Sequence, residues 1–390
     1  MTVARGDAVA LTRELVRIDS RNPSLVSGGP GEAAVARALA DVLRAWGFRV
    51  DVVEVAPGRP NVIARVGNSG GRTLMFNGHL DVVGVEGMVH PPFHAAEADG
   101  RLYGRGSCDM KAGVAAMCAA AVRAIDAGLA GEIIVAAVAD EEFESIGTRA
   151  LVESGVRAEA AIVTEPTGLA IMPSHLGFVW ADAEFRGRAA HGSRWELGVD
   201  AIRHAGLFLA ELDRYDAEVL STRSHVLLGR PSVHASTIEG GSGMSTYPDR
   251  CLVRLERRTI PGETPDQVVG ELRALLDCVR PMVERRGKAL TATVERTFAQ
   301  EPSDVAIDAP VVGALERALR EVGETVRIEG MTAWTDAAVL NAAGIPAICF
   351  GPGDISLAHA AEEYVPIDEI ERATRVLTAL AQSWCPGANE

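Results

Sequence analysis

The fold of this chain is decided by the stretch Leu74-Met75-Phe76-Asn77-Gly78-His79-Leu80-Asp81-Val82-Val83. Its first three residues form an apolar run that predicts a short buried strand, so His79 stands where a strand ends and a loop begins. His79 and Asp81 are two residues apart, and in an extended chain their side chains point to the same side. Such a pair can supply a metal-binding imidazole and a carboxylate that orients it. Taken alone, a histidine at a strand end is more often a satisfied polar residue than a metal ligand.

The composition of the chain excludes several classes of protein. Its 390 residues suggest roughly two or three domains. The formal net charge of −15 argues against binding to nucleic acid or to an anionic membrane, because both require a basic face. No uninterrupted apolar run reaches the ~20 residues of a membrane helix. The alanine-rich run at residues 112–122 instead favours a buried helix.

The cysteines and the N-terminus indicate the compartment. The six cysteines are scattered through apolar segments and include no Cys-x-x-Cys pair, which disfavours a zinc ribbon or a thioredoxin-like site. Their scatter is typical of reduced core residues in a cytosolic protein. The first residues lack a basic region followed by an apolar segment, so we expect no signal peptide. A cytoplasmic protein is therefore predicted.

The order of the expected helices and strands predicts an α/β layered domain with a second domain inserted into it. Up to residue 176, amphipathic helices alternate with buried strands, among them the wholly apolar residues 133–139. Residues 177–300 instead follow a β-α-β-β-α-β order, which is typical of a split βαβ sandwich. The α/β pattern returns in residues 301–390. We therefore expect a catalytic domain of residues 1–176 and 301–390 around an inserted domain of residues 177–300.

Five residues of metal-ligating type follow predicted strands or turns. In open α/β sheets, functional side chains gather at the carboxyl ends of the strands. Two histidines and three carboxylates suit a pair of divalent cations such as zinc, which must share a carboxylate because like charges repel. A free carboxylate beside such a pair is placed to activate water. The five residues are His79, Asp109, Glu142, Glu165 and His359.

Each acidic or histidine residue of this set also has a simpler interpretation. An acidic residue after a strand is often a helix cap, which applies to Asp109 and Glu165. Glu141 and Glu142 alone could be a solvated charge pair. His359 precedes an acidic run and could be a surface histidine. The metal-centre interpretation is favoured because all these residue types occur together, after predicted strands or turns, in an otherwise apolar context.

The segments that carry these residues resemble the M20 family of metallohydrolases. This family includes acetylornithine deacetylase, succinyl-diaminopimelate desuccinylase, aminoacylase-1 and the glutamate carboxypeptidases. The similarity spans nearly the whole chain and rests on residues 78–83, 104–113, 140–142, 164–167 and 351–353, the last followed by His359. It implies a zinc-peptidase-like α/β/α catalytic domain, an inserted α+β (ferredoxin-like) domain that serves as lid and dimerisation domain, and a homodimer.

The resemblance implies a role for each residue of the centre. Asp109 would bridge two Zn²⁺ ions, for which Co²⁺ can substitute. His79 and Glu165 would complete one metal site. Glu142 and His359 would complete the other.

The resemblance also gives roles to the residues around these ligands. Asp81 would orient His79, and Glu141 would act as general base and proton shuttle. In the family, the peptide bond after the bridging aspartate is usually cis. A cis bond between Asp109 and Met110 is therefore implied.

Two residues of the inserted domain match the family as well. Residues 187–192 resemble a segment whose histidine, here His191, helps to stabilise the oxyanion, often in the neighbouring subunit's active site. Residues 257–262 resemble a segment with a carboxylate-binding arginine, placed here at Arg258. An arginine fork fits a substrate carboxylate. The alternatives are a structural role for His191 and a surface ion pair for Arg258.

Three positions depart from the family's common pattern. Ser245 stands near a position where the family commonly carries asparagine, which leaves a substrate contact there open. Trp334 lies in Ala-Trp-Thr-Asp, in place of the commoner Ser-Asp, and could narrow the pocket. Glu165, in place of aspartate, favours the deacylase branch over the glutamate-releasing carboxypeptidases.

These features predict a metal-dependent amidohydrolase that removes an acetyl or succinyl type of acyl group from the amino group of an amino acid. Glu141 would deprotonate a water activated by two zinc ions, and this water would attack the amide carbonyl. His191 would stabilise the oxyanion, and Arg258 would hold the α-carboxylate. One alternative is an M20 dipeptidase or carboxypeptidase that acts on short peptides. A more remote one is a non-catalytic ligand-binding relative, which is disfavoured because all ligand positions and Glu141 are intact.

Overall fold

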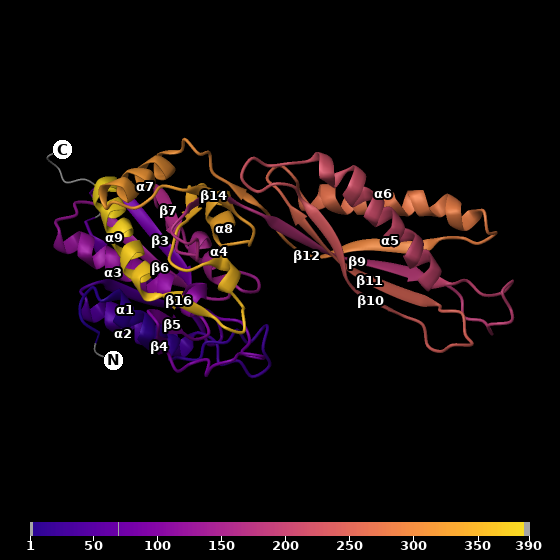
Figure 1. Ribbon diagram of the computed structural model, residues 1–390, viewed down its shortest axis with the longest axis horizontal. Coiled ribbons are helices and arrows are strands. Elements are labelled where there is room, and N and C mark those ends of the chain that lie inside the picture. Colours follow the sequence, from indigo (N-terminus) through magenta and orange to yellow (C-terminus); the bar gives the residue numbers. More distant parts are fainter. Residues whose placement is uncertain (1–2, 69, 386–390) are drawn as a thin grey trace. The chain divides into compact units, whose positions relative to one another are not determined.

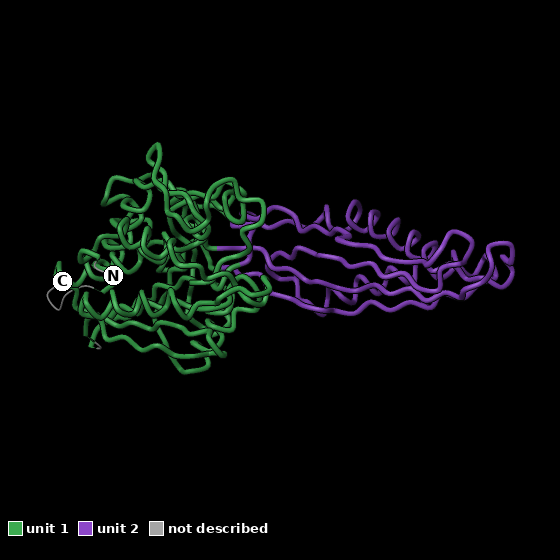
Figure 2. Tube along the Cα trace, turned by 90° about the horizontal axis from the view of Figure 1, so that it is seen from below, with its two compact units in different colours: residues 1–173, 305–330, 335–390 green, residues 174–304, 331–334 purple. Residues whose placement is uncertain are grey.

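The computed structural model describes residues 3–68 and 70–385, and the chain divides into two compact units. The first unit comprises Met1–Pro173, Val305–Gly330 and Thr335–Glu390, and the second comprises Ser174–Asp304 and Met331–Trp334 (Figure 2). The borders expected from the sequence, after residues 176 and 300, lie a few residues from these.

The segment Met331–Trp334 was expected in the catalytic domain but groups with the second unit. Its backbone explains this placement, because the Leu176 N–H donates to the Met331 carbonyl at 3.1 Å. The side chain of Trp334 adds a second contact within this unit, since its Nε1–H donates to the Glu301 carbonyl at 2.9 Å.

A mixed sheet forms the centre of the fold (Figure 1). Its strands are β1 (Arg49–Ala56), β2 (Arg59–Gly67), β3 (Thr73–His79), β6 (Glu132–Val138), β7 (Ala160–Val163), β8 (Ile171–His175), β13 (Ser303–Asp304), β14 (Ile328–Met331) and β15 (Ala347–Cys349). They follow the order β1-β2-β6-β3-β7-β15-β8-β13, with β14 paired to β8. Strands β6, β3, β7 and β15 run parallel, so their carboxyl ends lie along one edge.

Helices cover both faces of this sheet. They are α1 (Ala8–Val16), α2 (Ala33–Ala45), α3 (Ala112–Asp126), α4 (Ile146–Glu153), α7 (Pro310–Glu321), α8 (Ala337–Ala342) and α9 (Ile367–Trp384). Helices α1, α2, α3, α7 and α9 share one buried hydrophobic cluster with strand side chains such as Val62 and Val135. The neighbouring side chain of Asn61 points to the opposite face, where its Nδ2 donates to the Gly147 carbonyl of α4 at 2.8 Å.

Helix α3 and strand β6 show why this α/β packing forms. All seven residues of β6 are buried, as expected for a strand covered on both faces. The alanine-rich run predicted to be a buried helix is α3, and its small side chains allow close packing. A Cβ atom at Gly113 would lie 1.9 Å from the Thr164 carbonyl oxygen, so this contact requires glycine.

The second unit has the predicted β-α-β-β-α-β order. Its main elements are β9 (Gly177–Arg186), α5 (Ala201–Glu218), β10 (Ser232–Gly240), β11 (Arg250–Thr259), α6 (Pro265–Glu284) and β12 (Thr291–Gln300). The antiparallel sheet runs β10-β11-β9-β12. Alternate residues of β9, including Val179 and Phe185, join a separate hydrophobic cluster with α5 and α6. The predicted α+β fold of the inserted domain is confirmed.

Several short elements complete the described chain. They are β4 (Ala96–Ala98), β5 (Arg101–Tyr103), β16 (Tyr364–Pro366), η1 (Ser107–Lys111), η2 (Leu220–Thr222) and η3 (Ile355–Leu357). Among residues 3–68 and 70–385, no helix is long and apolar enough to cross a membrane. All six cysteines carry free thiols.

The predicted homodimer stays a prediction. Strand β10 forms one edge of its sheet, and most of its residues are exposed. An exposed edge strand is a place where a second sheet can join.

Candidate metal centre

The parallel strands bring the predicted ligands to one edge of the sheet. Strand β3 ends at His79 itself, and β6 ends just before the loop that carries Glu141 and Glu142. Strand β7 ends at Val163, two residues before Glu165. The carboxyl ends of parallel neighbours meet at one edge, and this is why residues distant in the sequence converge.

The first group of ligands consists of His79, Asp109 and Glu165. One ligand atom of each lies within 4.8 Å of the others. His79 Nε2 is 3.0 Å from Asp109 Oδ1, and all three residues are buried. The Oε1 atom of Glu165 is buried and has no hydrogen-bond partner among the described residues. A buried carboxylate oxygen without a partner is costly, so this group suits a bound cation.

The second group consists of Asp109, Glu142 and His359, again within 4.8 Å. His359 Nε2 is 2.9 Å from Glu142 Oε2 and 3.5 Å from Asp109 Oδ2. The Oε1 atom of Glu142 also lacks a partner in the described chain. Asp109 is thus shared, with one oxygen near each histidine. The His359 side chain is 53% exposed, so this group can be reached from solvent.

The charges in this centre perturb one another strongly. Burial raises the pKa of Glu165 well above its ordinary value, and the Asp109 carboxylate raises it further. Burial acts to lower the pKa of His359, but the hydrogen bond to Glu142 raises it to about 9. Burial also acts to lower the pKa of His79, yet the hydrogen bond to Asp109 holds this pKa well above 6.5. The negative charge of the buried carboxylates must therefore be offset by protons or by cations. Metal ions that bind here would replace the protons.

Glu141 lies beside both groups without belonging to either. Its Oε2 atom is 3.9 Å from His79 Nε2, and only a tenth of its side chain is exposed. Burial raises the pKa of Glu141 well above its ordinary value, and the charge of Glu165 adds to the rise. A buried carboxyl whose pKa is raised has the property required of a general base or acid.

The turn that carries Glu141 is fixed by Asp81. The Asp81 carboxylate accepts the backbone N–H groups of Glu141 at 3.2 Å and Glu142 at 3.3 Å. It also accepts a hydrogen bond from Asn22 Nδ2 at 2.8 Å. His79 Nδ1 donates to the Asp81 backbone carbonyl at 2.9 Å and lies 3.7 Å from its carboxylate. Asp81 thus contacts His79 mainly through its backbone, which leaves Nε2 of the imidazole toward the ligands.

Residues 75–383 match Peptidase family M20/M25/M40. The chain belongs to this family. An acetylornithine deacetylase from Myxococcus xanthus is 34% identical over 332 residues, which cover 84% of each chain. The N-formyl-4-amino-5-aminomethyl-2-methylpyrimidine deformylase of Bacillus subtilis (strain 168) is 28% identical, over 90% of this chain and 89% of that one. The aminopeptidase PepT from Bacillus cereus shares the fold, with a TM-score of 0.79, 22% identity, and coverage of 98% and 100%.

Glu363 is a buried residue of this M20 hydrolase that the sequence did not single out. Its Oε1 accepts the backbone N–H groups of Cys108 at 3.0 Å and Asp109 at 3.1 Å, and its Oε2 accepts from Arg105 Nη1 at 2.5 Å. Glu363 is fully buried and therefore fixes the backbone of the shared aspartate. In the sequence Glu363 stands beside Glu362 in an acidic run, and only its burial in the structure distinguishes it.

The backbone around the shared aspartate follows the family pattern. The Asp109–Met110 peptide bond is cis, as the resemblance implied. His359 has a φ of 60°, a left-handed conformation that is uncommon for a residue with a side chain.

The predicted residues of the inserted domain lie in the second unit. His191 is exposed, and its Nδ1 is 2.9 Å from Ser193 Oγ. Arg258 is partly exposed, lies over the Phe178 ring at 5.2 Å, and donates from Nε to Glu256 Oε1 at 2.7 Å. The ion pair that the sequence left as an alternative for Arg258 is therefore present.

Two of the three positions that depart from the family pattern, Ser245 and Trp334, also lie in this unit. Ser245 contacts the His191 loop through its backbone, because its carbonyl accepts the Gly192 N–H at 2.7 Å. Trp334 packs edge-on against His175, with the ring centroids 6.1 Å apart. Each contact is structural, and a substrate contact for either residue stays a prediction.

Proposed function

We propose that this protein is a metal-dependent amidohydrolase that removes an acyl group of acetyl or succinyl type from the amino group of an amino acid. One observation carries the proposal: Asp109 is shared by two ligand groups, and the free carboxylate of Glu141 lies beside them. The 34% identical relative, an acetylornithine deacetylase, supports an N-acyl amino acid as substrate.

The donor set fits two divalent cations. Each group combines one imidazole with carboxylates, and each contains a buried carboxylate oxygen that lacks a partner in the described chain. Nitrogen and oxygen donors of this kind suit zinc, and cobalt accepts the same ligands. Bound ions of this type polarise a carbonyl and lower the pKa of water.

The residues of the chain then have separate tasks. Glu141 takes a proton from the attacking water and delivers it to the leaving amine nitrogen. Asp81 keeps Glu141 in place, because its carboxylate holds the backbone N–H of that residue at 3.2 Å. His191 donates a hydrogen bond to the oxyanion that forms on the substrate carbonyl, and Arg258 binds the α-carboxylate through its guanidinium fork.

Removal of metal tests the cofactor assignment. Dialysis against a chelator is expected to abolish activity, and Zn²⁺ or Co²⁺ to restore it, because Asp109, Glu142 and Glu165 would otherwise face one another without a cation. Elemental analysis of the active protein is expected to give two ions per chain. Unchanged activity after complete removal of metal would exclude the proposed cofactors.

A substrate panel tests the reaction. With metal supplied, kcat/KM is expected to be higher for N-acetyl and N-succinyl amino acids than for dipeptides. Faster hydrolysis of dipeptides would instead make the protein a dipeptidase or carboxypeptidase. No hydrolysis of any amide by the metal-loaded protein would favour a ligand-binding role.

The role of Arg258 is tested by its replacement with alanine. We expect KM for an N-acyl amino acid to rise about 10- to 100-fold with a smaller change in kcat, because a charge-assisted hydrogen bond contributes about 1.5–3 kcal/mol. Arg254→Ala is the matched control, since Arg254 lies on the same strand and pairs with Glu239. Equal KM values for Arg258→Ala, Arg254→Ala and the unmodified protein would leave Arg258 with only its ion pair to Glu256.

A further inference from the structure

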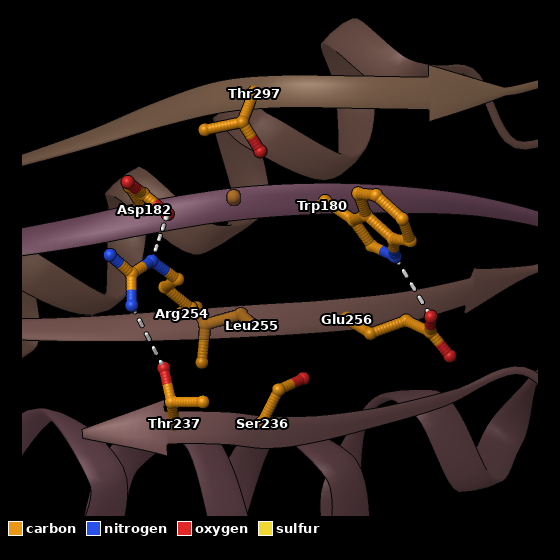
Figure 3. Close-up of a pocket in the computed structure, with 9 residues that line it drawn as sticks. Trp180, Asp182, Ser236, Thr237, Arg254, Leu255, Glu256 and Thr297 are labelled. Carbon is orange, nitrogen blue, oxygen red and sulfur yellow. Dashed lines mark hydrogen bonds and ion pairs between the residues drawn. The ribbon is translucent and has the colours of Figure 1, made fainter. Parts of the chain in front are cut away.

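The second unit has a cavity of about 260 Å³ on the outer face of its sheet (Figure 3). Several of the polar side chains that line it are already paired. Trp180 Nε1 donates to Glu256 Oε2 at 2.8 Å, and Arg254 lies 4.0 Å from Asp182 and 2.8 Å from Glu239. A ligand here would have to displace these contacts. This cavity, called the reference cavity below, therefore supplies the control variant for the second cavity of the unit.

A different cavity, of about 240 Å³, lies where the loop before α5, the first turn of α5 and the residues after α6 meet. Three cationic side chains line it, those of Arg203, Arg286 and Lys288. Two aromatic residues, Trp195 and Tyr247, contribute to the same wall. Such a cluster of positive charge contrasts with the net charge of −15 of the whole chain.

The positive charge of this cavity is poorly compensated within the chain. Asp200 is the acidic residue among its lining, and its Oδ1 accepts the backbone N–H of Arg203 at 2.9 Å as the N-cap of α5. Across the described residues, the guanidinium groups of Arg203 and Arg286 have neither a hydrogen bond nor a carboxylate within 4.0 Å. Lys288 Nζ donates to the carbonyls of Trp195 and Glu196, which are neutral acceptors.

A buried imidazole lines the same cavity. His204 is only 4% exposed, and its Nδ1 has no hydrogen-bond partner in the part of the chain that the structure describes. Burial lowers the pKa of His204; the Asp200 carboxylate acts to raise it, and the charges of Arg286 and Arg203 act to lower it. Arg203 and Arg286 thus line one cavity as exposed side chains without a carboxylate partner among the described residues, and an anion placed between two such positive charges is attracted to both.

The walls of the cavity are held in place without a ligand. Lys288 fixes the loop through its bond of 2.9 Å to the Glu196 carbonyl. The Gly198 N–H donates to the Arg194 carbonyl at 3.1 Å. Gly198 also packs on Tyr247, where a Cβ atom would lie 2.4 Å from the ring. These contacts arrange the loop wall in advance, so that this wall loses less entropy when a ligand binds.

We propose that this cavity is a binding site for a small oxyanion of the phosphate class, held between Arg203 and Arg286. A planar guanidinium fork matches the geometry of such an anion and binds it through two parallel hydrogen bonds. Lys288 adds a third positive charge. All the residues of this site belong to the second unit and none is a predicted metal ligand, so the proposal does not depend on the hydrolytic reaction.

Calorimetric titration with inorganic phosphate, at constant ionic strength set with chloride, tests the proposal on the metal-loaded protein. The unmodified protein is expected to show saturable binding. The double variant Arg203→Gln with Arg286→Gln is expected to bind about tenfold more weakly or worse, because it loses charge-assisted hydrogen bonds. Arg254→Gln, in the reference cavity where the arginine is already paired, is the matched control and is expected to bind like the unmodified protein.

Two results would overturn the proposal. One is equal phosphate binding by the double variant, which would place the ion elsewhere, including at the metal centre. The other is heat that follows ionic strength without saturation. Circular dichroism checks the fold of each variant, and if the double variant does not fold, the single variant Arg286→Gln decides by the same criterion.

Discussion

Replacing Glu141 with glutamine is expected to abolish measurable turnover while the metal content of the protein stays unchanged. Glutamine has the size of glutamate but cannot take the proton from water, and loss of a general base typically costs about 10²–10⁴ in rate, or about 3–5 kcal/mol of transition-state stabilisation. Glu141 belongs to neither ligand group, so the ions should remain. Steady-state kinetics together with elemental analysis measure both effects.

A matched control comes from the same turn. Glu144 is exposed, and its backbone N–H donates to Asp140 Oδ2 at 3.2 Å, so Glu144→Gln changes a charge nearby without touching the centre. This variant should keep its activity. If Glu141→Gln remains fully active, another group must move the proton; if it loses its metal, Glu141 is a ligand.

The second large effect is expected at Glu363. Replacing it with leucine should weaken the binding of both ions, because Glu363 fixes the backbone of Asp109, which both ligand groups share. It should also destabilise the fold by about 3–5 kcal/mol, since Arg105 is left buried without its partner. Thermal unfolding measures the stability, and the absorption spectrum of the Co²⁺-loaded protein reports the ligand geometry.

A double variant separates positioning from stability. Glu363→Leu combined with Arg105→Met removes both buried charges and should recover much of the stability. It still lacks the acceptor for the N–H groups of Cys108 and Asp109, so metal binding should remain weak. Glu362→Gln, at the exposed neighbour, is the matched control. Metal binding that recovers together with stability would reduce Glu363 to a purely structural role.

Most of the fold could be predicted because its signals are local. The apolar run of β6 and the alternation of buried and more exposed residues along β9 each appear within a few consecutive residues. Both strands could therefore be located from the sequence. The β-α-β-β-α-β order of the second unit follows from the same periodicities. The sequence did not indicate the short strands β4, β5, β8, β13, β14 and β16, because their residues show neither an extended apolar run nor a clear alternation.

The candidate site could be predicted only as a set of residues. The sequence names His79, Asp109 and Glu165 because ligand types follow strands, and the structure brings them within 4.8 Å. The roles assigned to them stay predictions. Glu363 could not be predicted, because the burial of an acidic residue depends on how distant parts of the chain pack around it.

The sequence by itself determined the family, the layered α/β fold and the identities of the residues that meet at the strand ends, because these depend on local periodicity and side-chain chemistry. The tertiary structure decided which of the adjacent residues Arg257 and Arg258 has a side chain that a ligand can reach. Arg257 is fully buried beside Glu263, while Arg258 lies on the outer face over Phe178. It also decided that Arg203 and Arg286 line one cavity. Such facts depend on which face of a sheet the helices cover and on contacts between distant segments, and no short stretch of sequence contains them.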